Sequence, residues 1–409
     1  MLLWFPNNNL GRENQVMKKL FLYLLILYYD IESLMLRLVK SKRQSDTLIL
    51  RTDNIGDFIL WLDSASEIRK RLNGRITLLC SSAVASFAKN IAYFDEIQTI
   101  DTKKFFFNPI YRFKLLKKLK VQSYDLILNP VFSRDYFIGD SIVRNVVASK
   151  KIGFGQNYKN TESRFAGLLK DKKQRKQLVD KLLSKSSSFY TSLIESEAGN
   201  KMELKRNAEF VSGFFVCKFK SSLPELCFSL PEFEVKDNYV VVFVGASQVK
   251  KNWGGRKFLQ LIESINCSVV LCGGSGDCEI SDYVMKRVSQ PGKVMDFVGK
   301  TSLLELCSII QKSRFVISND TMATHLAAML RVRSIVICPG HHKMRFHPYD
   351  TDVDSKELKQ YFPILVQYEM DCFDCGGVCI HTKSKTECCP CIENVSVEMV
   401  MVEVNKLLC

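Results

Sequence analysis

The sequence predicts an α/β protein built around two parallel sheets, and three observations lead to this fold class. From residue 46 onward, short apolar runs alternate with longer segments of helical periodicity, which is typical of strands joined by crossover helices. The alternation occurs in two series, and the second begins near residue 239. The chain has 409 residues, of which 46% are hydrophobic, so it is long enough for two or three domains with a core in each.

Composition narrows the possible functions. A content of 46% hydrophobic and 25% charged residues is that of a globular protein, and it excludes disordered, collagen-like and polytopic membrane classes. Lys and Arg number 58 against 43 Asp and Glu, which gives a net charge of +15. The surface should therefore attract nucleic acid, lipid headgroups or a phosphorylated substrate. No recognisable nucleic-acid-binding motif accompanies the charge, so nucleic acid is not expected as a partner.

The first expected element is an amphipathic helix over residues 20–38, within an N-terminal segment 1–45. The apolar run 20–29 has ten residues, whereas a transmembrane helix needs about 20, and no small-residue cleavage site follows it. The helix either lies on a membrane surface or packs against the protein. The basic residues that flank it are Lys18, Lys19, Lys40, Lys42 and Arg43.

The first strand series falls in residues 46–232, which we expect to form one α/β domain with a parallel sheet. Its strands are expected at residues 47–51, 75–80, 96–100 and 125–130. Residues 103–120 hold seven basic residues and no acidic one, interleaved with aromatic side chains. This segment either lies on an anionic membrane or nucleic acid, or is a solvated connecting helix. Residues 152–231 are helical and basic in pattern, with an exposed loop at 184–188.

A second domain of the same class is expected over residues 233–409, after a boundary near residues 231–237. Its strands are expected at residues 239–244, 268–272, 294–298, 314–318 and 334–338. Two such halves would enclose a cleft, and α/β folds bind their ligands in clefts at the carboxyl ends of parallel strands. Polar residues that follow these strands are therefore the candidate site residues.

The first candidate motif runs from Arg51 through Asn54 and Gly56 to Asp57, directly after the strand 47–51. Gly56 permits a tight turn into a helix, and Asp57 then falls in the first turn of that helix, facing the cleft. Asp57 is a candidate catalytic residue. An acidic residue near a helix N-terminus is also common because of the helix dipole alone, so both interpretations stay open.

The second motif places small residues, Gly245 to Ser247, at the end of strand 239–244, and Lys250, Lys251 and Trp253 follow. Small residues let a ligand approach the backbone. A lysine within reach of the same strand end can hold a phosphate as a point charge. The alternative is a surface lysine on a loop.

The third motif runs from Ser318 to Ala328, after the strand 314–318. Asp320 and Thr321 precede a helix whose free N–H groups suit a phosphate. His325 lies one turn into that helix, so its side chain can point back toward the helix start. A lone His on a helix is usually structural, but the Asp and Thr directly before this one favour a functional role.

The fourth motif is a cysteine cluster. Of the 15 Cys, nine are scattered singly, which is typical of buried thiols in a reducing cytosol, and six lie between residues 372 and 391. Such short spacings are typical of a tetrahedral thiolate zinc site, and the alternative is a tight loop of free thiols. The candidate ligands are Cys372, Cys375, Cys379 and Cys391.

In this order and spacing, the motifs resemble glycosyltransferase family 9, the heptosyltransferase family of lipopolysaccharide core assembly. The resemblance covers the chain from about residue 47 to its end. It implies a GT-B fold, in which two Rossmann-like domains with parallel sheets face a central cleft, and a C-terminal helix. It implies a nucleotide-sugar donor, with ADP-heptose as the first candidate, and a lipid-linked glycan acceptor. It also implies work at an anionic membrane surface, on the cytoplasmic face of the inner membrane.

The resemblance assigns roles to the candidate residues. Asp57 is implied as the general base of a single inverting displacement, and Arg51, Asn54 and Gly56 as acceptor-side residues. The residues implied on the donor side are Ser247, Lys251, Asp320, Thr321, Met322 and His325, with Asp277 and Glu279 as candidates for recognising the base and ribose. No cofactor is required for catalysis, because a helix N-terminus and a lysine can neutralise a leaving diphosphate.

One position departs from the family pattern, because Met322 stands where the family usually has Gly. A side chain pointing inward there would keep the backbone away from the diphosphate. Two other functions remain as alternatives. One is a different nucleotide-sugar enzyme on the same architecture, such as an epimerase, which needs no acceptor. The other is a non-enzymatic zinc-containing protein that binds nucleic acid and is indifferent to Asp57.

Overall fold

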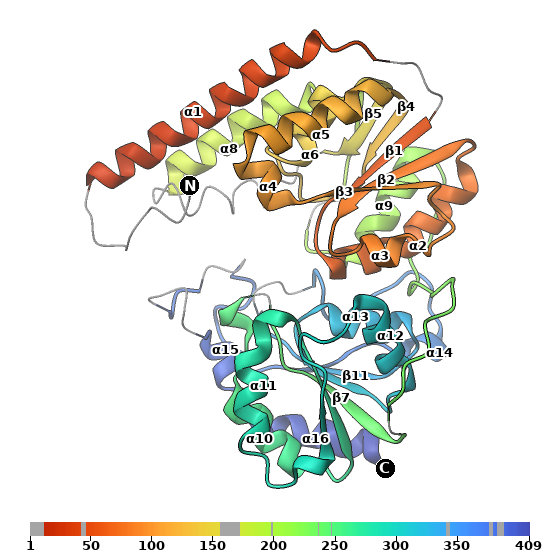
Figure 1. Ribbon diagram of the computed structural model, residues 1–409, viewed down its shortest axis with the longest axis vertical. Helices are drawn as coiled ribbons and strands as arrows, with labels where there is room; N and C mark the ends of the chain where they lie inside the picture. Colours follow the sequence, from red (N-terminus) through yellow and green to blue (C-terminus); the bar gives the residue numbers. More distant parts are fainter. Residues whose placement is uncertain are drawn as a thin grey trace. The chain divides into compact units, whose positions relative to one another are not determined.

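The computed structural model describes residues 12–41, 46–155, 172–197, 199–235, 237–246, 248–340, 344–375, 379–382 and 388–409. The chain divides into two compact units, each with one six-stranded parallel sheet flanked by helices (Figure 1). The first unit consists of Met1–Asn54, Glu67–Glu197 and Glu209–Lys218. The second consists of Ile55–Ser66, Ala198–Ala208 and Phe219–Cys409. The second unit therefore begins earlier than residue 233 and includes two short segments from the expected first domain.

The first unit contains the strand order β3-β2-β1-β4-β5-β6. Its strands are β1 (Asp46–Arg51), β2 (Arg75–Ser81), β3 (Glu96–Ile100), β4 (Tyr124–Asn129), β5 (Ala148–Phe154) and β6 (Ser192–Ile194). The four strands predicted for this half are confirmed. β5 and β6 were not predicted, because β5 begins with polar and exposed residues and β6 is a three-residue edge strand.

Eight helices of the described chain involve residues of the first unit. They are α1 (Arg12–Arg37), α2 (Ile55–Arg71), α3 (Ala85–Ala88), α4 (Thr102–Phe107), α5 (Pro109–Gln122), α6 (Gly139–Asn145), α8 (Lys172–Ser187) and α9 (Glu203–Phe215). The basic segment 103–120 forms two capped helices, because Asn108 ends α4 and caps α5 just before Pro109. The prediction of an exposed loop at residues 184–188 is mostly wrong, because α8 continues to Ser187.

The N-terminal helix α1 is an integral part of the first unit. Its Glu32 carboxylate accepts a hydrogen bond of 2.6 Å from Arg112 Nε, and both side chains are buried. The Arg112 guanidinium also lies 3.5 Å from the ring centroid of Tyr29. Asp30 pairs with Arg144 of α6 at 2.6 Å and with Lys185 of α8 at 2.8 Å. Removing one member of a buried pair typically costs about 3 to 5 kcal/mol, so these contacts fix α1 in place.

The second unit contains the strand order β12-β11-β10-β7-β8-β9. Its strands are β7 (Tyr239–Phe243), β8 (Ser268–Cys272), β9 (Val294–Asp296), β10 (Val316–Asn319), β11 (Ser334–Ile337) and β12 (Ile364–Val366). The principal helices are α10 (Gly255–Ser264), α11 (Cys278–Met285), α12 (Leu303–Lys312), α13 (Met322–Met329), α14 (Lys356–Lys359), α15 (Pro390–Glu393) and α16 (Val397–Leu408). The five strands predicted for this half are confirmed, and β12, with three residues, was not predicted.

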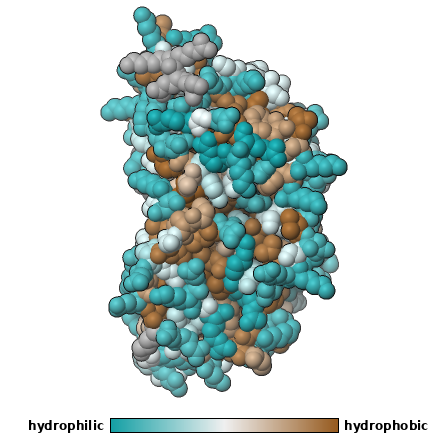
Figure 2. Space-filling model, turned by 90° about the vertical axis from the view of Figure 1, so that its right-hand side faces the viewer, coloured by the Kyte–Doolittle hydropathy of each residue, from teal (hydrophilic) through white to brown (hydrophobic). Residues whose placement is uncertain are grey.

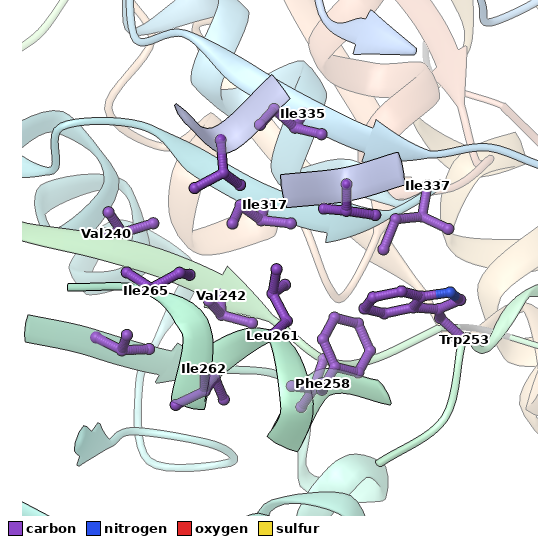
Figure 3. Packing of buried hydrophobic residues seen from close by; sticks show 14 of the residues in the cluster. Val240, Val242, Trp253, Phe258, Leu261, Ile262, Ile265, Ile317, Ile335 and Ile337 are labelled. Atoms are coloured by element: carbon purple, nitrogen blue, oxygen red, sulfur yellow. The ribbon is translucent and has the colours of Figure 1, made fainter. Parts of the chain in front are cut away.

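The core of the second unit lies between its sheet and helices α10 and α16. Trp253 and Phe258 meet edge to face, with their ring centroids 5.1 Å apart, beside Ile317 and Ile337 of the central strands (Figure 3). Val400 and Val404, one turn apart on α16, are fully buried in the same cluster. Burying a side chain of this size typically contributes about 1.5 to 3 kcal/mol, so α16 is held on the sheet by its apolar face.

Each sheet reverses its strand order at one point. In the first unit the reversal lies between β1 and β4, and Arg51 Nη1 at the end of β1 donates to the Pro130 carbonyl beyond β4. In the second unit it lies between β7 and β10. Asn319 Nδ2 at the end of β10 donates to the carbonyls of Val244 and Gly245 beyond β7. Such reversal points are where open α/β sheets bind ligands.

The surface drawn in Figure 2 carries many hydrophilic side chains, with hydrophobic ones in patches between them. This mixture is expected for a chain with 25% charged residues. Across the residues that the structure describes, no helix is both long enough and apolar enough to span a bilayer. The expectation that the apolar N-terminal run is too short to span a bilayer agrees with this finding.

Candidate active site

Asp57 lies in the first turn of α2, directly after the end of β1. The residue is 8% exposed. Its neighbour Gly56 packs so tightly that an added Cβ would lie 2.8 Å from Cδ2 of His325 on α13. Any larger residue at position 56 would push α2 away from α13. The missing side chain of Gly56 therefore lets the start of α2, which carries Asp57, lie directly against α13.

Arg345 connects the Asp57 carboxylate to a second acidic residue. Its Nη2 lies 3.9 Å from Asp57 Oδ1, and its Nε lies 3.4 Å from Glu203 Oε2. The backbone is fixed as well, since the Glu203 N–H donates to the Arg345 carbonyl at 2.7 Å. Arg345 and Glu203 were not predicted from the sequence, because neither comes directly after a strand and neither lies in one of the four motifs. The guanidinium thus orients the candidate base from the side of the 344–349 loop.

The start of α13 carries the most strongly coupled charges of the site. Thr321 caps this helix, and its hydroxyl accepts a bond from the Ala323 N–H. Asp320, just before the cap, pairs with Lys251 Nζ at 2.8 Å and lies 3.6 Å from His347 Nε2. Burial alone would raise the pKa of Asp320, but Lys251 and His347 together hold it well below its usual value. Asp320 is therefore a permanent carboxylate at neutral pH.

Lys251 is held in position by its neighbour Trp253. The Trp253 N–H donates to Asn319 Oδ1 at 3.1 Å, and the indole Nε1 donates to the Val395 carbonyl at 2.8 Å. Because Trp253 is anchored in the core, the short 3₁₀ helix Val249–Lys251 before it places the Lys251 ammonium beside Asp320. The second and third motifs of the sequence therefore meet at one charged pair.

His325 is buried and lies in a stack of rings. Its Nδ1 is 2.6 Å from the Tyr349 hydroxyl, and its ring stacks on those of His347 and Tyr349 at 5.4 and 5.9 Å between centroids. Burial, with a smaller contribution from His347, lowers the pKa of His325 to about 3. His325 is thus a neutral ring at physiological pH, packed against Gly56 of α2 and in contact with Tyr349.

His347 is the third residue of the site that the sequence did not reveal. It is 3% exposed, and within the described chain neither of its ring nitrogens has a hydrogen-bond partner, although Nε2 approaches Asp320. The ring nitrogens of a buried imidazole normally have hydrogen-bond partners, so this side chain is unusual. The only sequence signal for it is the pair His347 and Tyr349 around Pro348, in a loop after β11.

The buried His325 makes the free energy of unfolding depend on pH. The pKa is about 3 in the folded chain and 6.5 ordinarily, so below about pH 6.5 the unfolded state binds a proton that the folded state does not. This residue leaves stability unchanged above pH 7 and lowers it by up to about 1.4 kcal/mol for each pH unit below 6.5. Urea unfolding of the wild type and of His325→Gln between pH 7 and pH 5 should show a smaller loss in the variant. Parallel curves would contradict a neutral His325.

Three other candidate residues, Arg51, Asn54 and Asp277, differ in how they are packed and hydrogen-bonded within the protein. Arg51 is fully buried and pairs with Asp53 at 3.2 Å, so in this structure it supports the end of β1 from inside. Asn54 precedes α2 but makes no side-chain capping bond. Asp277 accepts a bond from the Gly274 N–H at 2.7 Å, and a Cβ at Gly245 would overlap its carboxylate.

The last three candidate residues on the donor side are Glu279, Met322 and Ser247. Glu279 is exposed in the first turn of α11. Met322 is half-buried, and its Cα lies 3.8 Å from the Cβ position of Gly56, so the helix start is close-packed there. Ser247 lies outside the described residues.

The candidate zinc ligands line one cavity without forming a metal site. Cys372, Cys375, Cys379 and Cys391 surround a cavity of about 20 Å³, together with His381 and Cys389. Within the described ranges, no three His, Cys, Asp or Glu side chains are arranged to hold a metal ion. Burial raises the pKa of Cys391, which favours the thiol over the thiolate that zinc needs. The described thiols are thus not gathered around one point, and residues 376–378 and 383–387 between them lie outside the description.

Comparison with known proteins identifies the family. Residues 112–361, more than half of the chain, match the model of glycosyltransferase family 9 (heptosyltransferase). The chain belongs to glycosyltransferase family 9. The enzyme class predicted from the sequence, a glycosyltransferase, is confirmed by this membership. The matched range starts after the Asp57 motif, so the role of Asp57 still depends on its geometry.

Individual relatives of this family 9 member are distant. It is similar to lipopolysaccharide heptosyltransferase 3 of Escherichia coli, with 25% identity over 141 residues, and the match covers 34% of this chain and 41% of that protein. The chain therefore matches less than half the length of that relative.

Solved structures of the family have the same architecture. E. coli heptosyltransferase WaaC, in a structure with ADP-2-deoxy-2-fluoro heptose, has a TM-score of 0.57 at 15% identity, over 88% of this chain and 99% of that one. A family 9 glycosyl transferase from Veillonella parvula has a TM-score of 0.60 at 14% identity, over 90% and 99%. At such identities the likeness establishes the fold, and the predicted GT-B fold is confirmed.

Proposed function

We propose that this chain transfers a heptosyl group from a nucleotide-activated heptose to a lipid-linked glycan acceptor of the lipopolysaccharide core type. The observation that carries the proposal is the packing of Gly56 on His325, which holds Asp57 beside the start of α13. A helix start with a lysine suits a diphosphate, and a carboxylate near it suits a reacting hydroxyl. ADP-heptose is the first candidate donor, in keeping with the ADP-fluoroheptose complex of WaaC.

The donor diphosphate is proposed to lie against the N-terminus of α13. The first N–H groups of that helix lack helical partners, and the helix dipole favours negative charge there. Lys251 adds a positive charge that it shares with Asp320, 2.8 Å away. Nδ1 of buried His347, which has no hydrogen-bond partner in the described chain, offers a further donor beside Asp320. These groups stabilise the leaving diphosphate without a metal ion.

The reaction is a single displacement. Asp57 takes the proton from an acceptor hydroxyl as the hydroxyl oxygen attacks the anomeric carbon of the heptose, through an oxocarbenium-like state. The bond from the anomeric carbon to the diphosphate breaks as the new glycosidic bond forms, and ADP leaves with the electron pair. Attack and departure occur on opposite faces of the sugar, so the configuration inverts. Arg345 keeps the Asp57 carboxylate oriented throughout.

A substitution of Met322 tests how closely the donor diphosphate approaches the start of α13. If the diphosphate must contact the backbone where this side chain stands, Met322→Gly should tighten ADP binding. If Met322 points away, the variant should leave ADP affinity unchanged and destabilise the start of α13 by about 1 kcal/mol or less. Calorimetric titration with ADP and thermal unfolding of the same samples distinguish the two. We expect unchanged affinity, because Met322 is half-buried in a close-packed helix start.

A thermal-shift series tests the donor assignment. ADP and ADP-heptose should raise the melting temperature more than UDP, GDP and their sugars, because a ligand that binds only the folded state stabilises it. Incubation with donor and a lipopolysaccharide core acceptor should then release ADP, whereas donor alone should stay unchanged. Conversion of the donor without acceptor would favour the epimerase instead. A stronger response to UDP-sugars would reject the heptose assignment.

We place the working enzyme, as part of this proposal, on the cytoplasmic face of the inner membrane as a peripheral protein. A lipid-linked acceptor requires the enzyme to reach the bilayer surface. The net charge of +15 favours an anionic surface. Of the basic residues expected beside the N-terminal helix, Lys19 and Lys40 are exposed, while the Lys18 side chain, Lys42 and Arg43 lie outside the description. Zinc binding stays a prediction from the cysteine spacing, and metal analysis of the purified chain would test it.

A further inference from the structure

A cationic pocket lies in the first unit beside the C-terminal end of α1. It has a volume of about 380 Å³ and is lined by eight residues. Four of them are basic and none is acidic: Arg37, Lys120, Arg144 and Lys151. The hydroxyls of Ser33 and Ser188 complete its polar wall. A pocket with this lining suits an anion with several oxygen atoms, such as a phosphate.

The positive charges of the pocket are only partly neutralised. Arg144 pairs with Asp30, but across the described part of the chain no carboxylate pairs with Arg37, Lys120 or Lys151. Lys151 Nζ donates to the Val143 carbonyl at 2.6 Å. Burial, and then the charge of Lys120, lowers the pKa of Lys151 to about 8. Burial and Arg37 likewise lower the pKa of Lys120. These cations repel one another, and a bound anion would relieve the repulsion.

Helix dipoles explain part of this arrangement but not all of it. Arg37, Lys120 and Arg144 lie in the last turns of α1, α5 and α6, where a cation is favourable on its own. Lys151 lies on strand β5, so no helix dipole favours its positive charge. The dipoles also do not account for an open volume among the cations. A ligand accounts for both.

The outward face of α1 is apolar from Met17 to its C-terminal end. Exposed apolar residues recur every three or four positions and are about half exposed or more: Met17, Leu20, Leu24, Leu27, Ile31, Leu34 and Leu38. The opposite face buries Leu22, Tyr29 and Leu36 in the first unit. The helix is therefore anchored on one side and presents a continuous apolar stripe on the other. An exposed apolar stripe of this kind suits the interface of a bilayer.

The stripe and the pocket meet at the same end of α1. Ser33 and Arg37 line the pocket, and Leu34 and Leu38 follow each of them by one residue. One residue corresponds to a turn of about 100° around a helix, so the two surfaces are adjacent. An amphipathic lipid has the same arrangement, with an acyl chain next to a phosphate.

We propose that α1 and the cationic pocket bind an anionic phospholipid, with the stripe in the acyl layer and the phosphate in the pocket. A second copy of the chain is the less favourable occupant, because two copies would bring the same unpaired cations together. The exposed lysines of α4 and α5 add to the attraction for an anionic bilayer: Lys103, Lys104, Lys114, Lys117 and Lys118. The proposal gives the membrane attachment put forward above a specific site, and it does not depend on the sugar that is transferred.

Sedimentation with vesicles tests the proposal. The probes are phosphatidylcholine vesicles alone, or doped with phosphatidic acid or with phosphatidylglycerol to equal surface charge. The wild type should bind phosphatidic acid vesicles best, because their phosphomonoester fits the pocket, and neutral vesicles hardly at all. Lys120→Gln/Lys151→Gln should lower the affinity for phosphatidic acid vesicles by about 10-fold or more, since charge-assisted bonds to phosphate are lost. Arg37→Gln, at an exposed position, should act in the same direction if the double variant does not fold.

Two controls separate the pocket from general charge and from the stripe. Lys89→Gln/Lys286→Gln removes two exposed lysines outside the pocket and should keep the preference for phosphatidic acid. Leu34→Glu should weaken binding to every vesicle. Equal binding of anionic and neutral vesicles by the wild type would overturn the proposal, as would unchanged binding of phosphatidic acid vesicles by the pocket variants. Stabilisation by inorganic phosphate without vesicle binding would assign the pocket to free phosphate instead. All variants should keep the thermal shift with ADP, so failure here is distinguishable from failure of the proposed donor site.

Discussion

Replacing Asp57 by Asn should lower the turnover number of heptosyl transfer by roughly 100-fold or more, while the affinity for ADP stays near that of the wild type. General-base catalysis typically contributes 10²- to 10⁴-fold, and Asn has the shape of Asp but cannot accept the proton of the acceptor hydroxyl. The donor groups at Lys251 and the start of α13 are left intact. Steady-state rates with donor and acceptor, together with calorimetric titration of ADP, measure the two quantities separately.

A second carboxylate on the same helix provides the matched control. Asp63 lies on α2, and its Oδ2 accepts a bond of 3.0 Å from the Ser222 N–H. Asp63→Asn should cost some stability but change turnover only a few-fold. If Asp57→Asn behaves like Asp63→Asn, Asp57 only stabilises the start of α2 through the helix dipole.

The central strands were predictable because they are continuous apolar runs bounded by turns. β7 has the sequence YVVVF and is wholly buried, so no helix or loop competes with the strand assignment. β5 has two lysines in its middle and buries only its last residues, and β6 and β12 have three residues each at sheet edges. A strand that is short or polar has too few apolar residues to show the hydrophobic periodicity from which strands are predicted.

The candidate site was predictable only where its residues follow strands. Asp57 and Asp320 come directly after β1 and β10, and the topology of a parallel sheet brings such residues to the carboxyl edge. The site also includes Arg345 and His347, which lie in one loop. Glu203, which contacts Arg345, lies about 140 residues away from it along the chain. No local pattern encodes a contact over that separation. The same holds for the deep burial of Arg51 at the end of β1.

Replacing Lys251 by Met should have two large effects with different causes. The affinity for ADP should fall by about 10- to 100-fold, since a charge-assisted contact to phosphate contributes about 1.5 to 3 kcal/mol, while the affinity for adenosine stays the same. The free energy of unfolding should fall by about 3 kcal/mol, because the buried Asp320 carboxylate loses its partner at 2.8 Å. Lys286→Met, which removes an exposed lysine of the same unit, should change neither quantity.

The double variant Lys251→Met/Asp320→Asn separates these two causes. Asp320 has a pKa below its usual value, so its pair contributes stability above about pH 4 that is lost as the pH falls through the lower pKa of the folded state. With both charges removed, no unpaired carboxylate remains, and a neutral pair in place of a buried ion pair is often as stable. Stability should therefore recover toward the wild type, while ADP binding should remain weak because the phosphate still lacks its lysine. If ADP binding recovers together with stability, Lys251 supports the fold of the site through Asp320 and does not contact the diphosphate.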